Sequence, residues 1–188
     1  MRTPAHPAHA DIIAATEAWL EKAVIGLNLC PFAKAVHIKK QIRYVVCDAS
    51  TPEDLLSMLM DELQTLSDCD PQQTDTTLLI HPHVLNDFLD YNEFLDVADA
   101  ALEDMDLVGE LQVASFHPQY QFADTEPDDI DNYTNRSPYP TLHLLREESI
   151  ERAVEAFPDA AGIFDRNIAT LRALGHQGWE QLGLAPKA

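Results

Sequence analysis

Apolar residues recur along the chain with two different spacings, and the two spacings predict helices and strands in turn. Several segments place apolar residues every three or four positions, which gives a helix one buried face. Such helices are predicted over residues 11–27, from 52 to about 66, from 86 to about 105, from 149 to 158 and over about 160–174, with a short one opening at Pro31.

Four shorter segments are rich in β-branched and aromatic residues and are predicted to be strands: residues 41–47, 76–81, 110–116 and 141–146. The order of elements predicts an α/β or α+β fold, with one small, partly parallel four-stranded sheet covered by about five helices. Two β-helix-β units favour parallel neighbours for the first three strands, and the fourth could pair antiparallel to the third. A ferredoxin-like split arrangement is the alternative.

The whole chain, residues 1–188, is predicted to form a single domain, because it contains no internal repeat and no linker. Residues 1–9 hold two prolines and two histidines and are expected to be frayed. The Gly-rich tail, residues 176–188, is expected to wrap onto the body through Trp179.

About two dozen residues between the third and fourth strands have no periodicity of their own. A segment of this length without regular structure is uncommon in a compact domain and is usually functional or disordered. Aromatic residues are scarce in disordered chain, yet this segment and its start hold five of them. We therefore predict an ordered loop that forms a site, built around Phe116, Tyr120, Phe122, Tyr133 and Tyr139.

The charge is very unevenly distributed, with a formal net charge of −20. Residues 44–135 contain no Lys or Arg but hold 22 of the 32 carboxylates. Binding to nucleic acid or to an anionic membrane surface requires cations, so both classes of function are excluded. An acidic surface most often serves solubility, and the functional alternative is a field that attracts a basic protein partner.

The three cysteines, Cys30, Cys47 and Cys69, are widely spaced and form no CxxC motif. This usage is typical of a reducing compartment rather than of a disulfide framework. The N-terminus lacks the apolar region of a signal peptide, and no apolar run has the length of a membrane span. The expected location is the cytoplasm, and the oligomeric state stays open.

The strand prediction has a consequence for four histidines. If the first three strands are parallel, their carboxyl ends share one edge of the sheet, where open α/β sheets place ligands. His81, His83 and His117 would lie at that edge, and a returning fourth strand would bring His143 close. Imidazoles suit zinc, iron or manganese, so His81, His83 and His117 are a candidate site for a divalent metal. Their spacing matches no standard metal motif, and hydrogen-bonded structural histidines are the alternative.

His117 and His143 are also the candidate catalytic residues, because a histidine performs acid–base chemistry near neutral pH without much tuning. Arg136 ends the cation-free stretch, and its planar guanidinium suits a carboxylate or phosphate. The alternative for Arg136 is a structural ion pair. Further candidates for binding the same anionic ligand are Tyr133, Asn135, Ser137 and Arg146.

Cys30 is a candidate reactive thiol, since it precedes Pro31 near a possible helix N-terminus, and such a position lowers a thiol pKa. The alternative is a buried, inert thiol in the L-C-P-F turn.

Three long segments resemble a bacterial family described as domain of unknown function 1415. They are A-T-E-A-W-L-E-K-A-V-I-G-L-N-L-C-P-F-A at residues 15–33, S-F-H-P-Q-Y-Q-F at 115–122, and D-N-Y-T-N-R-S-P-Y-P-T-L-H-L-L-R-E at 131–147. The resemblance extends from about Ile12 to Leu174 and implies a cytosolic bacterial protein of one domain. It implies no activity.

Two functions therefore follow from the sequence. The first is an enzyme or binding protein whose pocket, at residues 115–146, holds a small anionic molecule by His, Arg and Tyr side chains, with or without a metal. The second is a non-enzymatic interaction module whose acidic surface docks a basic protein.

Overall fold

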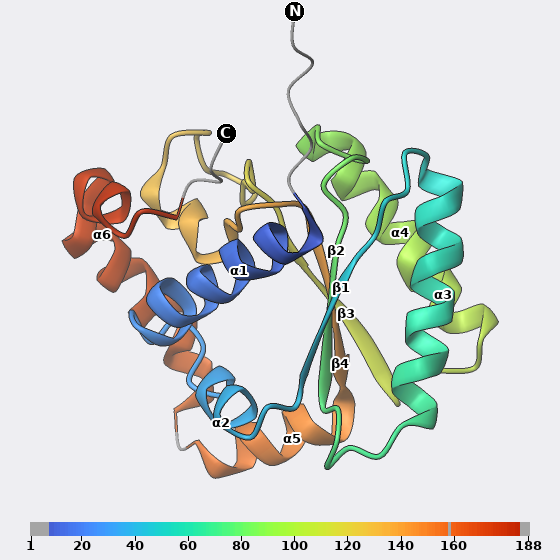
Figure 1. Ribbon diagram of the computed structural model, residues 1–188. Helices are drawn as coiled ribbons and strands as arrows, with labels where there is room; N and C mark the ends of the chain where they lie inside the picture. The colour runs from blue at the N-terminus through green and yellow to red at the C-terminus, as the bar shows by residue number, and fades with distance from the viewer. Residues whose placement is uncertain (1–7, 158, 185–188) are drawn as a thin grey trace, which may run out of the picture.

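Four strands form one mixed sheet, seen edge-on in Figure 1, with helices on both of its faces. The computed structural model describes residues 8–157 and 159–184. Along the sheet the strands are β1 (Ile42–Val46), β2 (Thr76–Ile80), β4 (Thr141–Arg146) and β3 (Leu111–Phe116). One face is covered by α3 (Pro52–Asp68) and α4 (Phe88–Asp104), and the other faces α1 (His9–Trp19), α2 (Ala33–Ile38) and α6 (Ile163–Gln181).

The directions of the strands agree with the prediction, but the order of the strands in the sheet differs from it. β1 pairs with β2 in parallel, and β4 pairs antiparallel with both β2 and β3. The first three strands therefore run the same way, yet β3 is not the neighbour of β2, because β4 lies between them. The first β-helix-β unit is direct and the second is split, so the alternative arrangement is realised in half of the sheet.

The central position of β4 has a physical reason in its sequence, T-L-H-L-L-R. Both faces of this strand carry buried side chains, as they do in β2, whereas β1 and β3 are only partly buried. Strands that are covered on both faces belong in the middle of a sheet.

The first predicted helix is divided into two forms. α1 ends at Trp19, and a π-helix, η1 (Leu20–Ile25), continues it. The Gly26 N–H donates to the Glu21 carbonyl at 3.0 Å, and the Leu29 N–H donates to that of Val24 at 2.9 Å. These wide i→i−5 bonds are rare and occur frequently at functional sites.

The helix starts follow side-chain capping. Thr51 caps α3 by accepting from the Asp54 N–H at 3.2 Å, and the helix begins at Pro52, as predicted. The helix predicted from residue 86 is capped one residue later, by Asp87, which accepts from the N–H of Leu89 at 2.8 Å at the start of α4.

The C-terminal part contains α5 (Glu147–Ala156), which follows β4 directly, and a 3₁₀ turn, η3 (Ala160–Gly162), before α6. Gly175, the predicted end of the last helix, adopts φ +65° and interrupts α6 without ending it. Trp179 packs edge-on against Tyr133 with ring centroids 5.1 Å apart, which places this part of α6 against the long loop. The predicted helix end at Pro158, the first seven residues and residues 185–188 lie outside the described residues.

The long loop is ordered around a buried amide. Asn132 lies in a 3₁₀ helix, η2 (Ile130–Asn135), and is fully buried. Its Oδ1 accepts from the Phe122 N–H at 2.9 Å and from the Thr125 hydroxyl at 2.8 Å, and its Nδ2 donates to the Glu126 carbonyl at 2.8 Å. One side chain thus ties residues 122–126 of the loop to η2.

The two sheet faces are filled unequally. The larger core lies between the sheet and α3 and α4 and contains fully buried leucines from every layer: Leu55, Leu59, Leu63, Leu79, Leu142 and Leu144. On the opposite face, the buried cluster is smaller and consists of Trp19, Leu20, Ala23 and Val24.

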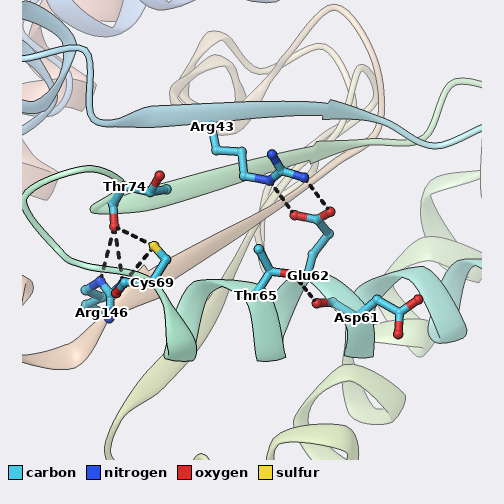
Figure 2. A network of polar contacts seen from close by, with 7 residues as sticks. All are labelled: Arg43, Asp61, Glu62, Thr65, Cys69, Thr74 and Arg146. Carbon is cyan, nitrogen blue, oxygen red and sulfur yellow. Dashed lines mark hydrogen bonds and ion pairs between the residues drawn. The ribbon is translucent and has the colours of Figure 1, made fainter.

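Arg146, at the end of β4, lies among backbone carbonyls in Figure 2. Its Nη2 donates to three carbonyls: that of Leu66 near the end of α3, that of Cys69 at 2.8 Å and that of Thr74 at 3.2 Å. A cation at the C-terminus of a helix also stabilises the helix dipole. The full length of β4 separates Arg146 from the loop of Arg136, so these contacts do not support the predicted shared ligand and indicate a structural role.

Figure 2 also shows an ion pair between the buried Glu62 of α3 and the exposed Arg43 of β1. Glu62 is only 6% exposed and accepts two hydrogen bonds from Arg43, at 2.8 and 3.0 Å. A two-pronged pair of this kind fixes the geometry between helix and strand.

Because Arg146 donates to several backbone carbonyls, its replacement should make the protein less stable. We expect Arg146→Ala to lower the free energy of unfolding by about 3 kcal/mol, because it leaves buried carbonyls at the end of α3 without donors. Urea denaturation measures the change. The control is Arg152→Ala, whose exposed pair with Glu148 should be worth no more than about 1 kcal/mol. Equal, small effects would leave Arg146 free for another role.

Candidate functional site

A cavity of about 660 Å³ lies between the sheet and the layer formed by α1, η1, α2 and α5. Ligand pockets typically measure about 300–1,000 Å³ and are mainly apolar, as this one is. Its inner lining residues are buried, among them Trp19, Val24 and Leu78. Lys39, Gln72 and Arg152 also line it and are exposed, so the cavity opens to solvent near α2 and α5.

The cavity exists because the local side chains are small and the covering elements short. Ala114 of β3 and Thr76 of β2 point to this face, whereas the other face carries large leucines. The covering helix α2 has only six residues. Phe32, before α2, and Phe157, after α5, meet edge-on at 5.9 Å and connect the two covering segments.

His143 is the central polar group of the cavity. It pairs with Leu78 on one side and Ala114 on the other, in the middle of the sheet. Its Nε2 lies 2.7 Å from Thr76 Oγ1, and the Thr76 hydroxyl donates to the Leu144 carbonyl at 2.6 Å. Since the hydroxyl proton is used there, Nε2–H must be the donor to Thr76. Burial lowers the pKa of His143 to about 4, so the ring is neutral at pH 7.

Cys30 lines the same cavity and lies in the loop between η1 and α2. Burial raises the pKa of its thiol, against the opposing effect of the Phe32 and Ala33 amides, so the thiol form is favoured at neutral pH. The sequence left open whether Cys30 would lie near the histidines. The structure brings Cys30 into the cavity of His143. Its reactivity stays a prediction.

His81 and His117 come together at the carboxyl edge of the strands, as predicted from strand direction. They lie on the side of α4, where the ring of Tyr91 is 5.7 Å from that of His81 and 5.0 Å from that of His117. The Tyr91 hydroxyl completes this edge, since it accepts from the Phe116 N–H at 3.2 Å and donates to the Thr141 carbonyl at 2.8 Å.

Both nitrogens of His117 already have hydrogen-bond partners. Nε2 donates to the Leu85 carbonyl at 3.1 Å, and Nδ1 accepts from the Gln119 N–H at 3.0 Å. The ring is fully buried, and burial lowers its pKa. In His81, Nδ1 donates to the Val84 carbonyl at 3.0 Å, and burial lowers its pKa to about 4. These contacts favour the structural alternative for both residues.

The predicted pair of His117 and His143 does not form one site. His117 packs with Phe88 and Tyr91 of α4, whereas His143 contacts Phe116 and lines the cavity on the opposite face. Among residues 8–157 and 159–184, no three His, Cys, Asp or Glu side chains are grouped so that they could hold a metal ion. The metal site of His81, His83 and His117 therefore stays a prediction without structural support.

Arg136 contacts other residues of the long loop and stabilises its conformation. Its Nε donates to the Tyr120 carbonyl at 3.2 Å, its Nη2 donates to that of Pro127, and its guanidinium carbon lies 4.3 Å from the centroid of the Tyr133 ring. The predicted structural alternative, an ion pair, is not seen for Arg136 in the described part of the chain.

The other predicted loop ligands have internal partners as well. Asn135 Nδ2 donates to the Ser115 carbonyl at 3.1 Å, and the Ser137 hydroxyl donates to that of Tyr139 at 2.6 Å. Tyr133, Arg136 and Ser137 line a second hollow of about 350 Å³ together with Trp19 and Trp179. The loop thus brings three of its predicted ligands together and ties Asn135 to β3.

Sequence reasoning missed Thr76, Trp19 and the π-helix as parts of a site. No periodicity reveals that Thr76 contacts His143, since the two residues are 67 positions apart and meet only through strand order. One signal was available: the segments at 15–33 and 131–147, which carry the family resemblance, contribute Trp19, Cys30 and His143 to the cavity.

The lowered pKa values of His81 and His143 predict a loss of stability in acid. An unfolded histidine has a pKa of about 6.5, so between about pH 6.5 and 4 the unfolded chain binds more protons than the folded one. The free energy of unfolding should fall over this window by about 3 kcal/mol for each group and level off below it. Urea denaturation from pH 7 to pH 4 measures this. His143→Phe should show a smaller fall than the wild type, and His176→Phe, at an exposed histidine, the full one. Equal slopes in His143→Phe and the wild type would contradict the lowered pKa.

Comparison with known proteins gives one finding. The family described as "Protein of unknown function (DUF1415)" matches residues 11–181. No curated protein and no solved structure matches the chain. In the described residues, no helix has the length and apolar character needed to cross a membrane. The family match runs from α1 through the end of α6 and includes every strand and the whole cavity. The chain therefore belongs to the DUF1415 family.

Proposed function

We propose that the protein binds a small anionic molecule with a mainly apolar body in the cavity between the sheet and α1, η1, α2 and α5. One observation carries this proposal: a space of about 660 Å³ lined mainly by apolar side chains. Protein interiors are close-packed, and an apolar space of this size costs stability when nothing fills it. A ligand that fills it would recover that free energy.

The charge at the opening supports an anionic group on the ligand. Lys39 and Arg152 line the opening, in a chain that has 12 Lys and Arg against 32 Asp and Glu. Arg152 pairs with Glu148, but both side chains are exposed, so a ligand could take over the guanidinium at little cost. Asp75 is also near, and it accepts a hydrogen bond from Ser149 at 2.6 Å. The apolar body would then point inward, toward Trp19 and Phe116.

Binding is the function that the site supports better than catalysis. Cys30 and His143 share the cavity and are the pair that an enzyme would use. Nucleophilic catalysis needs a thiolate, however, and burial raises the pKa of Cys30 and lowers that of His143. Neither shift favours transfer of the thiol proton to the imidazole.

A fluorescent probe tests the proposal. We expect 8-anilinonaphthalene-1-sulfonate, which has an apolar body and one anionic group, to bind saturably with one site. Ala114→Phe, which fills the cavity from β3, should raise the dissociation constant of the probe at least about tenfold, which is a loss of about 1.4 kcal/mol in binding free energy. The matched control, Ala100→Phe on the exposed face of α4, should bind like the wild type.

Thiol labelling gives a second readout of the same proposal. Bound probe should slow alkylation of Cys30 by iodoacetamide but not that of Cys69, which lies outside the cavity; mass spectrometry of the digested protein separates the two sites. Equal affinity of the wild type and Ala114→Phe, with Cys30 unprotected, would refute binding in this cavity.

The acidic face of α4 favours a second candidate function, the docking of a basic protein. Neither α3 nor α4 contains a Lys or Arg. Six carboxylates are exposed along α4: Asp90, Glu93, Asp96, Asp99, Glu103 and Asp104. The exposed Leu89 lies beside them and adds apolar contact area. Such a face would attract a basic surface over a distance set by salt.

Affinity capture at two salt concentrations tests this second candidate. We expect the immobilised wild type to retain a basic protein at low salt and to release it at high salt. It should be lost at low salt from the triple variant Asp96→Asn, Asp99→Asn, Glu103→Gln. The control neutralises Glu148, Glu151 and Glu155 of α5 by Gln and should retain the protein. Equal retention by both triple variants would exclude α4 as the docking face.

A further inference from the structure

His143 leaves one ring nitrogen without a partner. Its Nε2–H is committed to Thr76, which in turn donates to Leu144. In the described part of the chain Nδ1 forms no hydrogen bond, although the thiol of Cys30 and the amide of Gln112 line the same cavity. Three side-chain polar atoms in the described residues lack a hydrogen-bond partner and are fully enclosed: Tyr44 OH, Thr77 Oγ1 and His81 Nε2. His143 Nδ1 also lacks a partner, but it is not one of these enclosed atoms. It is therefore accessible.

The accessible side of this nitrogen is the cavity. β4 has a strand on each side, and α3 and α4 cover its other face, yet His143 remains partly exposed. Since its ring lines the cavity, that space gives Nδ1 its access. Around it are apolar surfaces: Phe116 lies 5.9 Å from the imidazole, and Trp19 packs edge-on against Phe116 at 5.1 Å.

The hydrogen-bond network also fixes what Nδ1 can do. A neutral imidazole has one donor and one acceptor nitrogen, and the Thr76 bond makes Nε2 the donor. Nδ1 is thus a fixed acceptor, held in orientation by a bond on the far side of the ring. An unpaired acceptor in apolar surroundings favours a ligand that brings a donor and disfavours one that brings another acceptor.

We propose that His143 is the specificity-determining residue of the cavity and that its Nδ1 accepts a hydrogen bond from a hydroxyl group on the inner end of the ligand. This inference rests on the proposed function. The ligand class is then a hydroxylated apolar acid, with the carboxylate at Lys39 and Arg152 and the hydroxyl at the opposite end. The aromatic walls formed by Trp19 and Phe116 suit a ring as the body between them.

Three acids that differ at one position test the proposal: 6-hydroxy-2-naphthoic, 6-methoxy-2-naphthoic and 2-naphthoic acid. Each has the anionic group and the apolar body, but only the first has a donor at the far end. Dissociation constants are measured by isothermal titration calorimetry and by displacement of 8-anilinonaphthalene-1-sulfonate. In the wild type we expect the hydroxy acid to bind about five- to tenfold more tightly than either of the others.

Two variants separate recognition from a structural effect. In His143→Phe the three acids should bind with equal dissociation constants, because the acceptor is lost while an apolar ring remains. In Thr76→Val the bond that fixes the tautomer is lost, so the imidazole can carry its proton on Nδ1. The preference for the hydroxy acid should then decrease and the methoxy acid should gain. A purely structural role of either residue would change all three affinities together.

Wild-type protein alone gives a readout that needs no variant to fold. ¹⁵N NMR of the imidazole should show the proton on Nε2, and the Nδ1 resonance should shift on adding the hydroxy acid but not the methoxy acid. Equal binding of the three acids to the wild type, or no displacement of the probe by any of them, would overturn this inference while binding of the probe keeps the proposed function. No binding of the probe itself would overturn the proposed function.

Discussion

β4 hydrogen-bonds with β2 along one side and with β3 along the other, and it runs against both. Most of the molecule depends on this insertion. A strand that returns between two parallel strands must begin at their carboxyl edge and end at their amino edge. The long loop therefore lies beside the ends of β2 and β3, and Arg146 reaches the end of α3. The same register sets His143 against Leu78 and Ala114, within reach of Thr76.

The insertion also explains why the two faces of the sheet differ. Leu142 and Leu144 of β4 point to α3 and α4 and complete a core of buried leucines. The alternate residues of the strand, His143 and Leu145, point to the opposite face, where Ala114 and Thr76 are their neighbours. Small and polar side chains at these positions leave a space that the short α2 and the π-helix η1 enclose rather than fill. The helical cover is thus adapted to a cavity.

The sequence was sufficient where the signal is local. The fourth strand agrees residue for residue with 141–146, and α3 begins at Pro52 as predicted, because helix starts and strand propensity depend on only a few neighbouring residues. Strand order is a non-local property, and only the pairing of β4 with β2 brings Thr76 to His143. His117 and His143 were expected to share a site for a different reason, which is that side-chain direction was not considered. Side chains alternate between the two faces of a strand, so His143 lines the cavity of Cys30 together with Ala114, while His117 packs on Tyr91. The π-helix was missed because its apolar spacing over so few residues does not differ from that of an α-helix.

The histidines also show how a structural role differs from a functional one in physical terms. His117 has both nitrogens paired and no exposed surface, so a ligand would have to break two hydrogen bonds to use it. His81 has an unpaired Nε2, but that atom is enclosed beside Tyr91, where nothing can reach it. An unpaired nitrogen of this kind costs stability and offers no function. His143 combines an unpaired nitrogen with access from a cavity large enough for a ligand. Of these three histidines, only His143 has an unmet hydrogen bond that a bound molecule can complete.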